Sequence, residues 1–349
     1  MNRWEKLVLV VAATATAAAG AAKYSGAPAL LAFGLATVAL AGLAWIVSFA
    51  TEQVGGRLGP AATGVLQSTL GNLPEFFVVI FALHAGKVVV AQTSIIGSVF
   101  ANALLVLGLA IVAGARIAED GVMRFQKRLP NDTATLLLLS VFIIVLIGTS
   151  VRSADLASHH VKAISIVGSA CLLVVYVAWL VPYIRTGGRG EELPAEPRVA
   201  VPTAAAVLAA AGVGAAFVSD WFIAALSPSM DRLNLSDAFA GLVVVAIAGN
   251  AVENVAGVVL AAKGQADLAI SVVKNSVSQV AVFLFPLLVL VSLLFAKPLT
   301  FELAPVYGAA LALTALSVWQ ITGDGEAAAF EGFALIALYV ILATVTLFE

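Results

Sequence analysis

Long apolar stretches separated by short polar loops run through the whole chain. A helix that crosses a membrane needs about 20 mostly apolar residues. By this measure we predict eleven membrane-spanning helices, at residues 6–22, 27–50, 60–84, 88–114, 132–150, 157–184, 199–225, 235–262, 266–295, 300–321 and 327–348. The pattern therefore predicts an all-α integral membrane protein.

The polar stretches divide the chain into parts. Residues 1–26 carry Arg3 and Lys6 before an apolar run with no clear cleavage site after it, so we expect a retained helix rather than a signal peptide. Residues 185–198 are rich in Gly, Pro and charged side chains, which is typical of a linker. We therefore expect an N-terminal helix at 1–26 and two five-helix repeats, at 27–184 and 199–349.

Composition agrees with a lipid environment. Hydrophobic residues make up 62% of the chain and charged residues 11%, whereas a soluble domain has about 25% charged residues. A net charge of −2 gives no indication of nucleic-acid binding. No HExxH or CxxC motif and no nucleophile–base set occurs, so the sequence supports neither an enzyme nor a cofactor. The oligomeric state stays open.

The distribution of Lys and Arg predicts the orientation. These residues are more frequent in the loops on the N-terminal side of the eleven predicted spans, and such loops are usually cytoplasmic. We therefore expect a cytoplasmic N-terminus, a cytoplasmic linker at 185–198 and an outside C-terminus. The short loops and the absence of a targeting signal favour a prokaryotic plasma membrane.

An internal repeat links two of the predicted spans. The segment Gly71-Asn72-Leu73-Pro74-Glu75 recurs 178 residues later as Gly249-Asn250-Ala251-Val252-Glu253. The two copies fall in the third and eighth predicted spans, and a separation of five spans reverses the direction of crossing. Inverted repeats of this kind place a substrate site near the middle of the bilayer and permit alternating access.

The repeated residues suit the transport of a cation. An ionised side chain deep in a membrane costs at least ~2.5–3.5 kcal/mol, so Glu75 and Glu253 are expected on an ion or proton path. Asn72 and Asn250 precede them by three residues and share their helix faces, and all four side chains offer the oxygen ligands that calcium prefers. A carboxylate also binds protons, so a cation and protons can compete for one site. The alternative is a protonated Glu that only joins two helices by a hydrogen bond.

The spans after the two motifs carry further polar residues. Candidates that line a pathway are Gln92, Ser94, Ser98, Asn102, Lys274, Ser276 and Gln279, and ordinary hydrogen bonds between helices are the alternative for each of them. Lys274 has two interpretations. Its ammonium reaches the membrane surface, or it lies near the motif glutamates and takes the place of part of a cation's charge.

These residues resemble a known family. Gly71-Asn72-x-x-Glu75 and Gly249-Asn250-x-x-Glu253, with the polar residues after each, resemble the two repeat motifs of CAX-type cation/proton exchangers of the calcium/cation antiporter superfamily. The resemblance implies alternating access, calcium bound by the two motif glutamates, and protons carried in the opposite direction.

Three departures concern the choice of ion. Asn254 stands where the family usually has His, Pro74 stands in place of Val, and Lys274 with Asn275 replaces an apolar residue and Gly. A sodium or other monovalent cation/proton exchanger and a cation channel therefore remain as alternatives.

Overall fold

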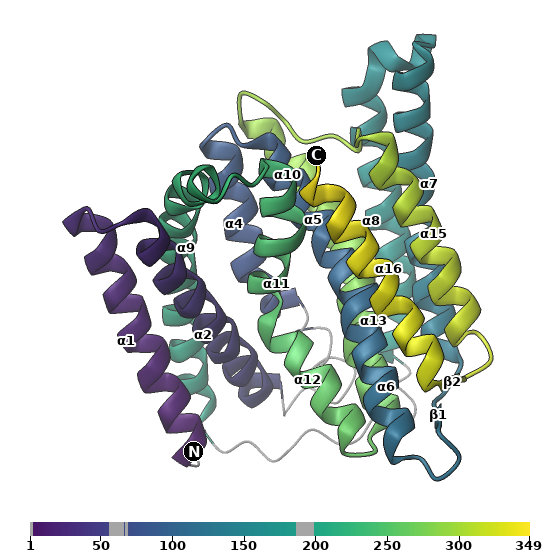
Figure 1. Cartoon of the computed structure of the whole chain (residues 1–349), viewed down its shortest axis with the longest axis horizontal. Coiled ribbons are helices and arrows are strands. Elements are labelled where there is room, and N and C mark those ends of the chain that lie inside the picture. The colour runs from purple at the N-terminus through teal and green to yellow at the C-terminus, as the bar shows by residue number, and fades with distance from the viewer. Residues whose placement is uncertain (1–2, 56–65, 67–68, 186–198) are drawn as a thin grey trace. The chain divides into compact units, whose positions relative to one another are not determined.

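The computed structural model describes residues 3–55, 66, 69–185 and 199–349, and helices make up most of it (Figure 1). The predicted linker lies outside the described residues apart from Arg185. The α-helices are α1 (Arg3–Ser25), α2 (Ala29–Gly55), α4 (Leu73–His84), α5 (Val88–Phe100), α6 (Leu107–Ile117), α7 (Arg128–Ser153), α8 (Val161–Arg185), α9 (Val201–Leu233), α10 (Asp237–Phe239), α11 (Ala246–Gly249), α12 (Ala251–Ala262), α13 (Ala266–Gln279), α14 (Phe285–Val291), α15 (Pro305–Thr322) and α16 (Ala329–Leu347).

Shorter elements complete the described part of the chain. Three π-helical stretches are η1 (Ala101–Val106), η3 (Ala240–Val245) and η4 (Val280–Leu284), and two 3₁₀ turns are η2 (Leu156–His160) and η5 (Ser292–Leu294). Two short strands, β1 (Val122–Arg124) and β2 (Glu326–Ala328), pair antiparallel with Met123 opposite Ala327.

Within the described residues, nine helical stretches are long and apolar enough to cross a membrane. They are Glu5–Ser25, Ala29–Val54, Val88–Ile117, Asn131–Ser153, Leu156–Pro182, Val201–Leu233, Ala266–Leu294, Pro305–Thr322 and Ala329–Leu347. The fold class is thus an all-α membrane protein, as predicted. The predicted number of eleven spans is not established, because the stretches expected at 60–84 and 235–262 are not continuous helices.

Both of these stretches are interrupted at the Asn of the repeated motif. Asn72 has φ −80° and ψ 3°, and Asn250 has φ −103° and ψ 12°, so neither has α-helical backbone angles. Pro74 follows as the second residue of α4, a position where its missing N–H removes no helical hydrogen bond. Discontinuous helices of this kind are typical of binding sites in transporters.

The helices form two compact units. The first contains residues 1–91 and 178–252, and the second contains 92–177 and 253–349. Each unit therefore takes residues from both halves of the sequence. The helices α5, α8 and α12 pass from one unit into the other.

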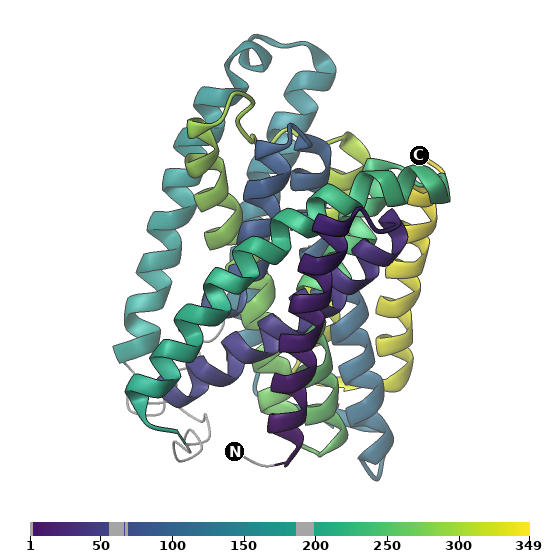
Figure 2. The same cartoon turned by 90° about the vertical axis from the view of Figure 1, so that its left-hand side faces the viewer.

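In the first unit, α2 packs along both α9 and α1. Figure 2 shows α9 running obliquely past α1 and α2. The rings of Phe33 and Phe222 lie 4.9 Å apart between α2 and α9, and a Cβ on Gly42 would lie 2.6 Å from the Cβ of Ala12 between α2 and α1. Small residues at such crossings let helices approach closely within a membrane.

In the second unit, α7 packs against α15 and α13, and α6 packs against α16. The last pair crosses at two glycines, because a Cβ on Gly108 would lie 2.6 Å from the carbonyl oxygen of Gly332. The strands β1 and β2 lie beside each other at one end of this unit (Figure 1). Arg124 pairs with Asp120 and Glu326 there, and the Gln126 N–H donates to Asp267 at 2.7 Å. These contacts bring the loops after α6 and α15 and the start of α13 to the same end of the unit.

Candidate functional site: a buried meeting point of the two motifs

The two copies of the repeated motif meet inside the first unit. Glu75 is the third residue of α4, and Gly249 is the last residue of α11. A Cβ on Gly249 would lie 4.0 Å from the Cβ of Glu75. Asn72, Glu75 and Asn250 are each at most 5% exposed. The structure therefore brings three of the four predicted ligand residues into one buried region.

Hydrogen bonds orient the backbone and the amide at this meeting point. The Nδ2 of Asn250 donates to the carbonyl oxygen of Ala246 at 2.9 Å. Because the amide nitrogen makes this bond, the oxygen of the same amide is the atom suited to a cation. On α9, the hydroxyl of Ser219 donates to the carbonyl oxygen of Pro74 at 3.4 Å, so α9 contacts the first turn of α4.

The helix ends add partial charges. The N-terminus of a helix carries a partial positive charge and the C-terminus a partial negative charge. Glu75 stands in the first turn of α4, where the helix end favours a carboxylate, and the last residue of α11, Gly249, approaches it. The region thus contains a carboxylate, amide side chains and a helix C-terminus, which are the kinds of group that supply oxygen ligands to a hard cation.

Glu253 holds the matching position in the second copy. It is the third residue of α12, as Glu75 is the third residue of α4. The backbone of Glu253 is described as helix, whereas its side chain lies outside the described part of the structure. Its role as a ligand therefore stays a prediction.

The end of α2 carries polar residues that the sequence analysis did not single out. Thr51 and Gln53 are buried in the last two turns of α2, and α2 contacts α4 and α11. The polar run Thr51-Glu52-Gln53 at the end of an apolar span is the signal that could have identified them.

The predicted pathway residues of α5 and η1 are mostly buried in the second unit. Ser94, Ser98 and Asn102 are each at most 1% exposed, and the Nδ2 of Asn102 donates to the carbonyl oxygen of Ser98 at 3.0 Å. The amide of Gln92 donates to the carbonyl oxygens of Thr300 and Glu302, at 3.3 Å and 3.0 Å. Gln92 therefore holds the segment before α15, and its part in a pathway is not tested by this contact.

The equivalent residues of the second motif lie on α13. Ser276 and Gln279 are buried there. At the spacing of the repeat, α5 corresponds to α13, and each helix leads into a π-helical stretch, η1 and η4 respectively. The similarity between the two motifs thus extends to local backbone geometry. Such π-helical insertions are frequent at functional sites.

Lys274 is buried rather than at the membrane surface. Its side chain is 0% exposed, and its Nζ donates to the Oγ1 of Thr322 at 3.0 Å. The Oγ1 of Thr133 lies 3.4 Å from the Lys274 carbonyl oxygen. The interpretation in which the ammonium extends to the membrane surface is therefore wrong for this structure.

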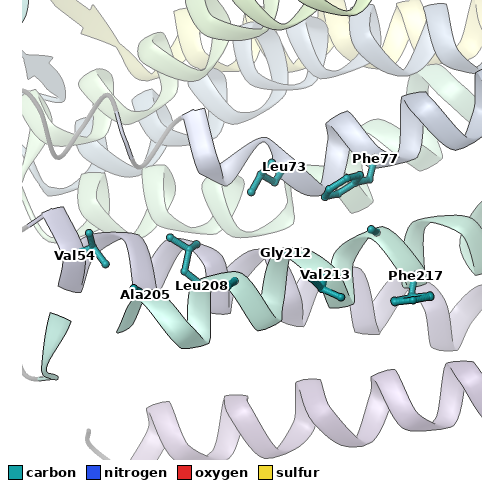
Figure 3. A pocket seen from close by; sticks show the side chains of 10 residues that line it. Val54, Leu73, Phe77, Ala205, Leu208, Gly212, Val213 and Phe217 are labelled. Carbon is teal, nitrogen blue, oxygen red and sulfur yellow. The ribbon is translucent and has the colours of Figure 1, made fainter. Parts of the chain in front are cut away.

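Two further observations concern metal-binding groups and cavities among the described residues. No group of three or more His, Cys, Asp or Glu side chains that could hold a metal ion occurs among the described residues. A cavity of about 520 Å³ between α2, α4 and α9 is lined only by apolar side chains, among them Val54, Leu73, Phe77 and Phe217 (Figure 3). This cavity offers no oxygen ligands to a cation.

Comparison with known proteins places the chain in a family. The sequence profile described as "Sodium/calcium exchanger protein" matches residues 28–184 and again residues 203–348. Among curated proteins, the chain is 31% identical to a vacuolar calcium ion transporter of Schizosaccharomyces pombe, over 89% of this chain and 77% of that protein. It is 29% identical to the Ca²⁺/H⁺ antiporter ChaA of Bacillus subtilis, over 90% and 92% of the two chains.

A solved structure has the same fold. The structure of native YfkE matches with a TM-score of 0.83 and 26% identity, over 98% of this chain and 100% of that one. The resemblance noted in the repeat motifs is thus confirmed at the level of the family. With its two profile matches covering most of its length, the chain belongs to the sodium/calcium exchanger protein family.

Proposed function

We propose that this protein is a secondary active antiporter that exchanges a cation, in the first place Ca²⁺, for protons. The observation that carries the proposal is the close approach of Gly249 to the buried Glu75, because it joins the two motif copies at a carboxylate. The printed names of the relatives, which include Ca²⁺/H⁺ antiporters, support Ca²⁺ as the cargo.

The cargo would bind to oxygen atoms of both motifs. Calcium takes 6–8 oxygen ligands and accepts carboxylates, amide oxygens and backbone carbonyls. Glu75 and Glu253 would supply the carboxylates, and Asn72 and Asn250 the amide oxygens. The carbonyls at the end of α11, whose last residue Gly249 approaches Glu75, would add acceptors.

Protons would use the same carboxylates. Burial favours the neutral, protonated form of a carboxyl group, whereas a bound cation favours the ionised form. A site of two glutamates thus holds either protons or a divalent cation, and in both states its charge is balanced. Alternating exposure of such a site to the two sides of the membrane couples the two fluxes.

The proposed architecture is an N-terminal helix at 1–26, repeats at 27–184 and 199–349 and a linker at 185–198. The two profile matches and the repeated order of helix and π-helical stretch support two repeats. The inverted orientation that we propose for them rests on the predicted offset of five spans, from the third to the eighth, which reverses the direction of crossing. We further propose a prokaryotic plasma membrane, a cytoplasmic N-terminus and an outside C-terminus.

Transport in inside-out vesicles tests the proposal. An acid-inside proton gradient is imposed and followed with a pH-sensitive dye, and Ca²⁺ and Na⁺ are added in separate experiments. Dissipation of the gradient by Ca²⁺, absent from vesicles without the protein, is the expected result. Dissipation by Na⁺ alone would make the protein a monovalent cation/proton exchanger, and large single-channel currents would make it a channel.

A further inference from the structure

An ion pair in the first unit joins the helices that carry the two motif copies. The Nζ of Lys87 lies 3.5 Å from the Oδ2 of Asp237, and the two side chains are 35% and 42% exposed. Lys87 follows the end of α4, and Asp237 is the first residue of α10. Both residues belong to the first unit. The proposed exchange mechanism assigns no role to either of them.

The ion pair and the close approach of the two motifs mark opposite ends of the same two helical segments. The first segment is α4, and the second is the stretch Asp237–Gly249, which contains α10, η3 and α11. At one end, Gly249 of the second segment approaches Glu75 of the first. At the other end, Lys87 after the first segment pairs with Asp237 of the second. The two segments therefore run antiparallel.

The spacing between these two places is the same on both segments. Lys87 follows Glu75 by twelve residues, and Gly249 follows Asp237 by twelve residues. At 1.5 Å per residue, each separation is roughly 18 Å. One register of the two segments therefore forms the ion pair and brings Gly249 to Glu75. A slip by one helical turn, about 5.4 Å, would abolish both.

Both charged residues are fixed to the ends of their helices. The N–H of Lys87 donates to the carbonyl oxygen of Ala82 at 2.8 Å, across the end of α4. The hydroxyl of Ser236 accepts from the N–H of Phe239 at 3.1 Å and caps α10 directly before Asp237. A cation at a helix C-terminus and a carboxylate at a helix N-terminus are also favoured by the helix dipoles. Each charge therefore moves together with its segment.

We propose that Lys87 and Asp237 are positioning residues for the motif site. Their ion pair sets the register of α4 against the stretch 237–249 and so holds Gly249 beside Glu75. The inference rests on the proposed exchange function and deepens it. At roughly 18 Å along the helix from Glu75, the pair acts through the position of the helices and not as a ligand of the cation.

The test removes the two opposite charges one at a time. The purified full chain, Lys87→Gln and Asp237→Asn are placed in proteoliposomes, and the half-saturating Ca²⁺ concentration of proton-coupled exchange is measured. Both variants lose the same ion pair, so both should raise this concentration, by about two- to fivefold for a partly exposed pair. A direct effect of each charge on the approaching cation would instead have opposite signs in the two variants. Opposite signs would overturn the proposal.

The double variant and the salt dependence test the pair itself. Lys87→Gln combined with Asp237→Asn should shift the half-saturating Ca²⁺ concentration no more than either single variant, because the second substitution has no pair left to break. High ionic strength, set with choline chloride, screens an exposed pair, so the wild type should approach the variants. Additive shifts, or a difference that high salt leaves unchanged, would contradict a role of the pair.

Arg124→Gln is the matched control. It breaks exposed ion pairs with Asp120 and Glu326 in the second unit, so it should leave the half-saturating Ca²⁺ concentration unchanged. Thermal unfolding in detergent separates positioning from a general loss of stability. A lower Tm in both single variants with an unchanged half-saturating Ca²⁺ concentration would overturn the proposal.

Failure of the proposed function would look different. The wild type itself would then show no Ca²⁺-driven proton flux. If the wild type exchanges Ca²⁺ for protons and both single variants keep its half-saturating Ca²⁺ concentration, only the role of the ion pair is overturned.

Discussion

Glu75 and Gly249 come from motif copies 178 residues apart, yet Gly249 ends α11 directly beside the first turn of α4, with 4.0 Å between its Cβ position and the Cβ of Glu75. Two interrupted helices make this contact possible. Because α4 starts and α11 ends at the motif asparagines, a carboxylate and the end of a helix reach the same buried place.

The contact predicts a dependence on side-chain size at position 249. Alanine at 249 makes an ordinary van der Waals contact with Glu75 and should leave transport near the wild-type level. Leucine must displace Glu75, and a displacement of about 1 Å at a reacting group can cost on the order of 100-fold in rate, so we expect at least a tenfold loss. Initial rates of Ca²⁺-driven proton flux in vesicles, at matched expression, measure the effect.

Gly212 provides the matched control. A Cβ on Gly212 would also lie 4.0 Å from its neighbour, the Cδ1 of Leu73, but in the apolar cavity of Figure 3. Gly212→Leu should therefore reduce transport less than Gly249→Leu. Equal losses in both variants would mean that any large side chain packed against α4 reduces transport, and that displacement of Glu75 is not the cause.

The class of fold and the motifs were predictable from the sequence for a physical reason. A helix must be apolar and about 20 residues long to cross the bilayer, so apolar stretches of this length are visible in the sequence. Three such stretches are helices in the structure, and they end at residues 25, 153 and 347. The acids at 75 and 253 were conspicuous because charge is rare in such stretches. For Glu75, the expected position away from water agrees with the structure, in which this residue is 3% exposed.

The interruptions and the surroundings of Lys274 were not predictable in the same way. Hydropathy averages over a window and therefore does not detect a single non-helical residue such as Asn72 or Asn250. Whether a lysine extends to the surface or stays buried depends on a partner distant in the sequence. Thr322, which accepts the hydrogen bond of Lys274, is 48 residues away.

The close crossing of α6 and α16 predicts that alanine at Gly108 lowers the stability of the protein, whereas alanine at a glycine with free space around it does not. A Cβ on Gly108 would lie 2.6 Å from the carbonyl oxygen of Gly332, so alanine at 108 forces the two helices apart. Overpacking of this kind typically costs about 1–3 kcal/mol. Thermal unfolding in detergent should show a lower Tm for Gly108→Ala than for the wild type.

Gly34 is the control for that measurement. It lies within α2, and a Cβ there would meet no atom within 4 Å. Alanine is favoured over glycine in a helix by about 1 kcal/mol, so Gly34→Ala should keep or raise the Tm. A Tm for Gly108→Ala at or above that of Gly34→Ala would contradict the close crossing.

Asp155 lies outside the membrane-spanning segments, and its contribution to the stability of the fold should depend on pH. The Ser150 hydroxyl, together with the N–H groups of Ala157 and Ser158, holds the pKa of Asp155 below its ordinary value. The ionised form is bound more strongly in the folded state. Its contribution to stability is therefore present above the ordinary pKa and is lost as the pH falls through the lowered pKa.

The measurement compares the wild type with Asp155→Asn across pH. The variant should have a lower Tm at neutral pH, and the difference should shrink below about pH 4, the ordinary pKa of Asp. Asp231→Asn is the control, because this exposed carboxylate makes no side-chain hydrogen bond within the described residues. A difference for Asp155→Asn that stays constant with pH would mean that the carboxylate charge is not involved.

The central claim is that the motif glutamates carry both the cation and the protons. Its most direct test records Ca²⁺ uptake and proton release in the same proteoliposomes for the wild type, Glu75→Gln, Glu253→Gln and the exposed control Glu302→Gln. We predict that the wild type and Glu302→Gln show both fluxes in a fixed ratio, and that each motif variant loses both fluxes together. Full coupled exchange in Glu75→Gln or Glu253→Gln would contradict the claim.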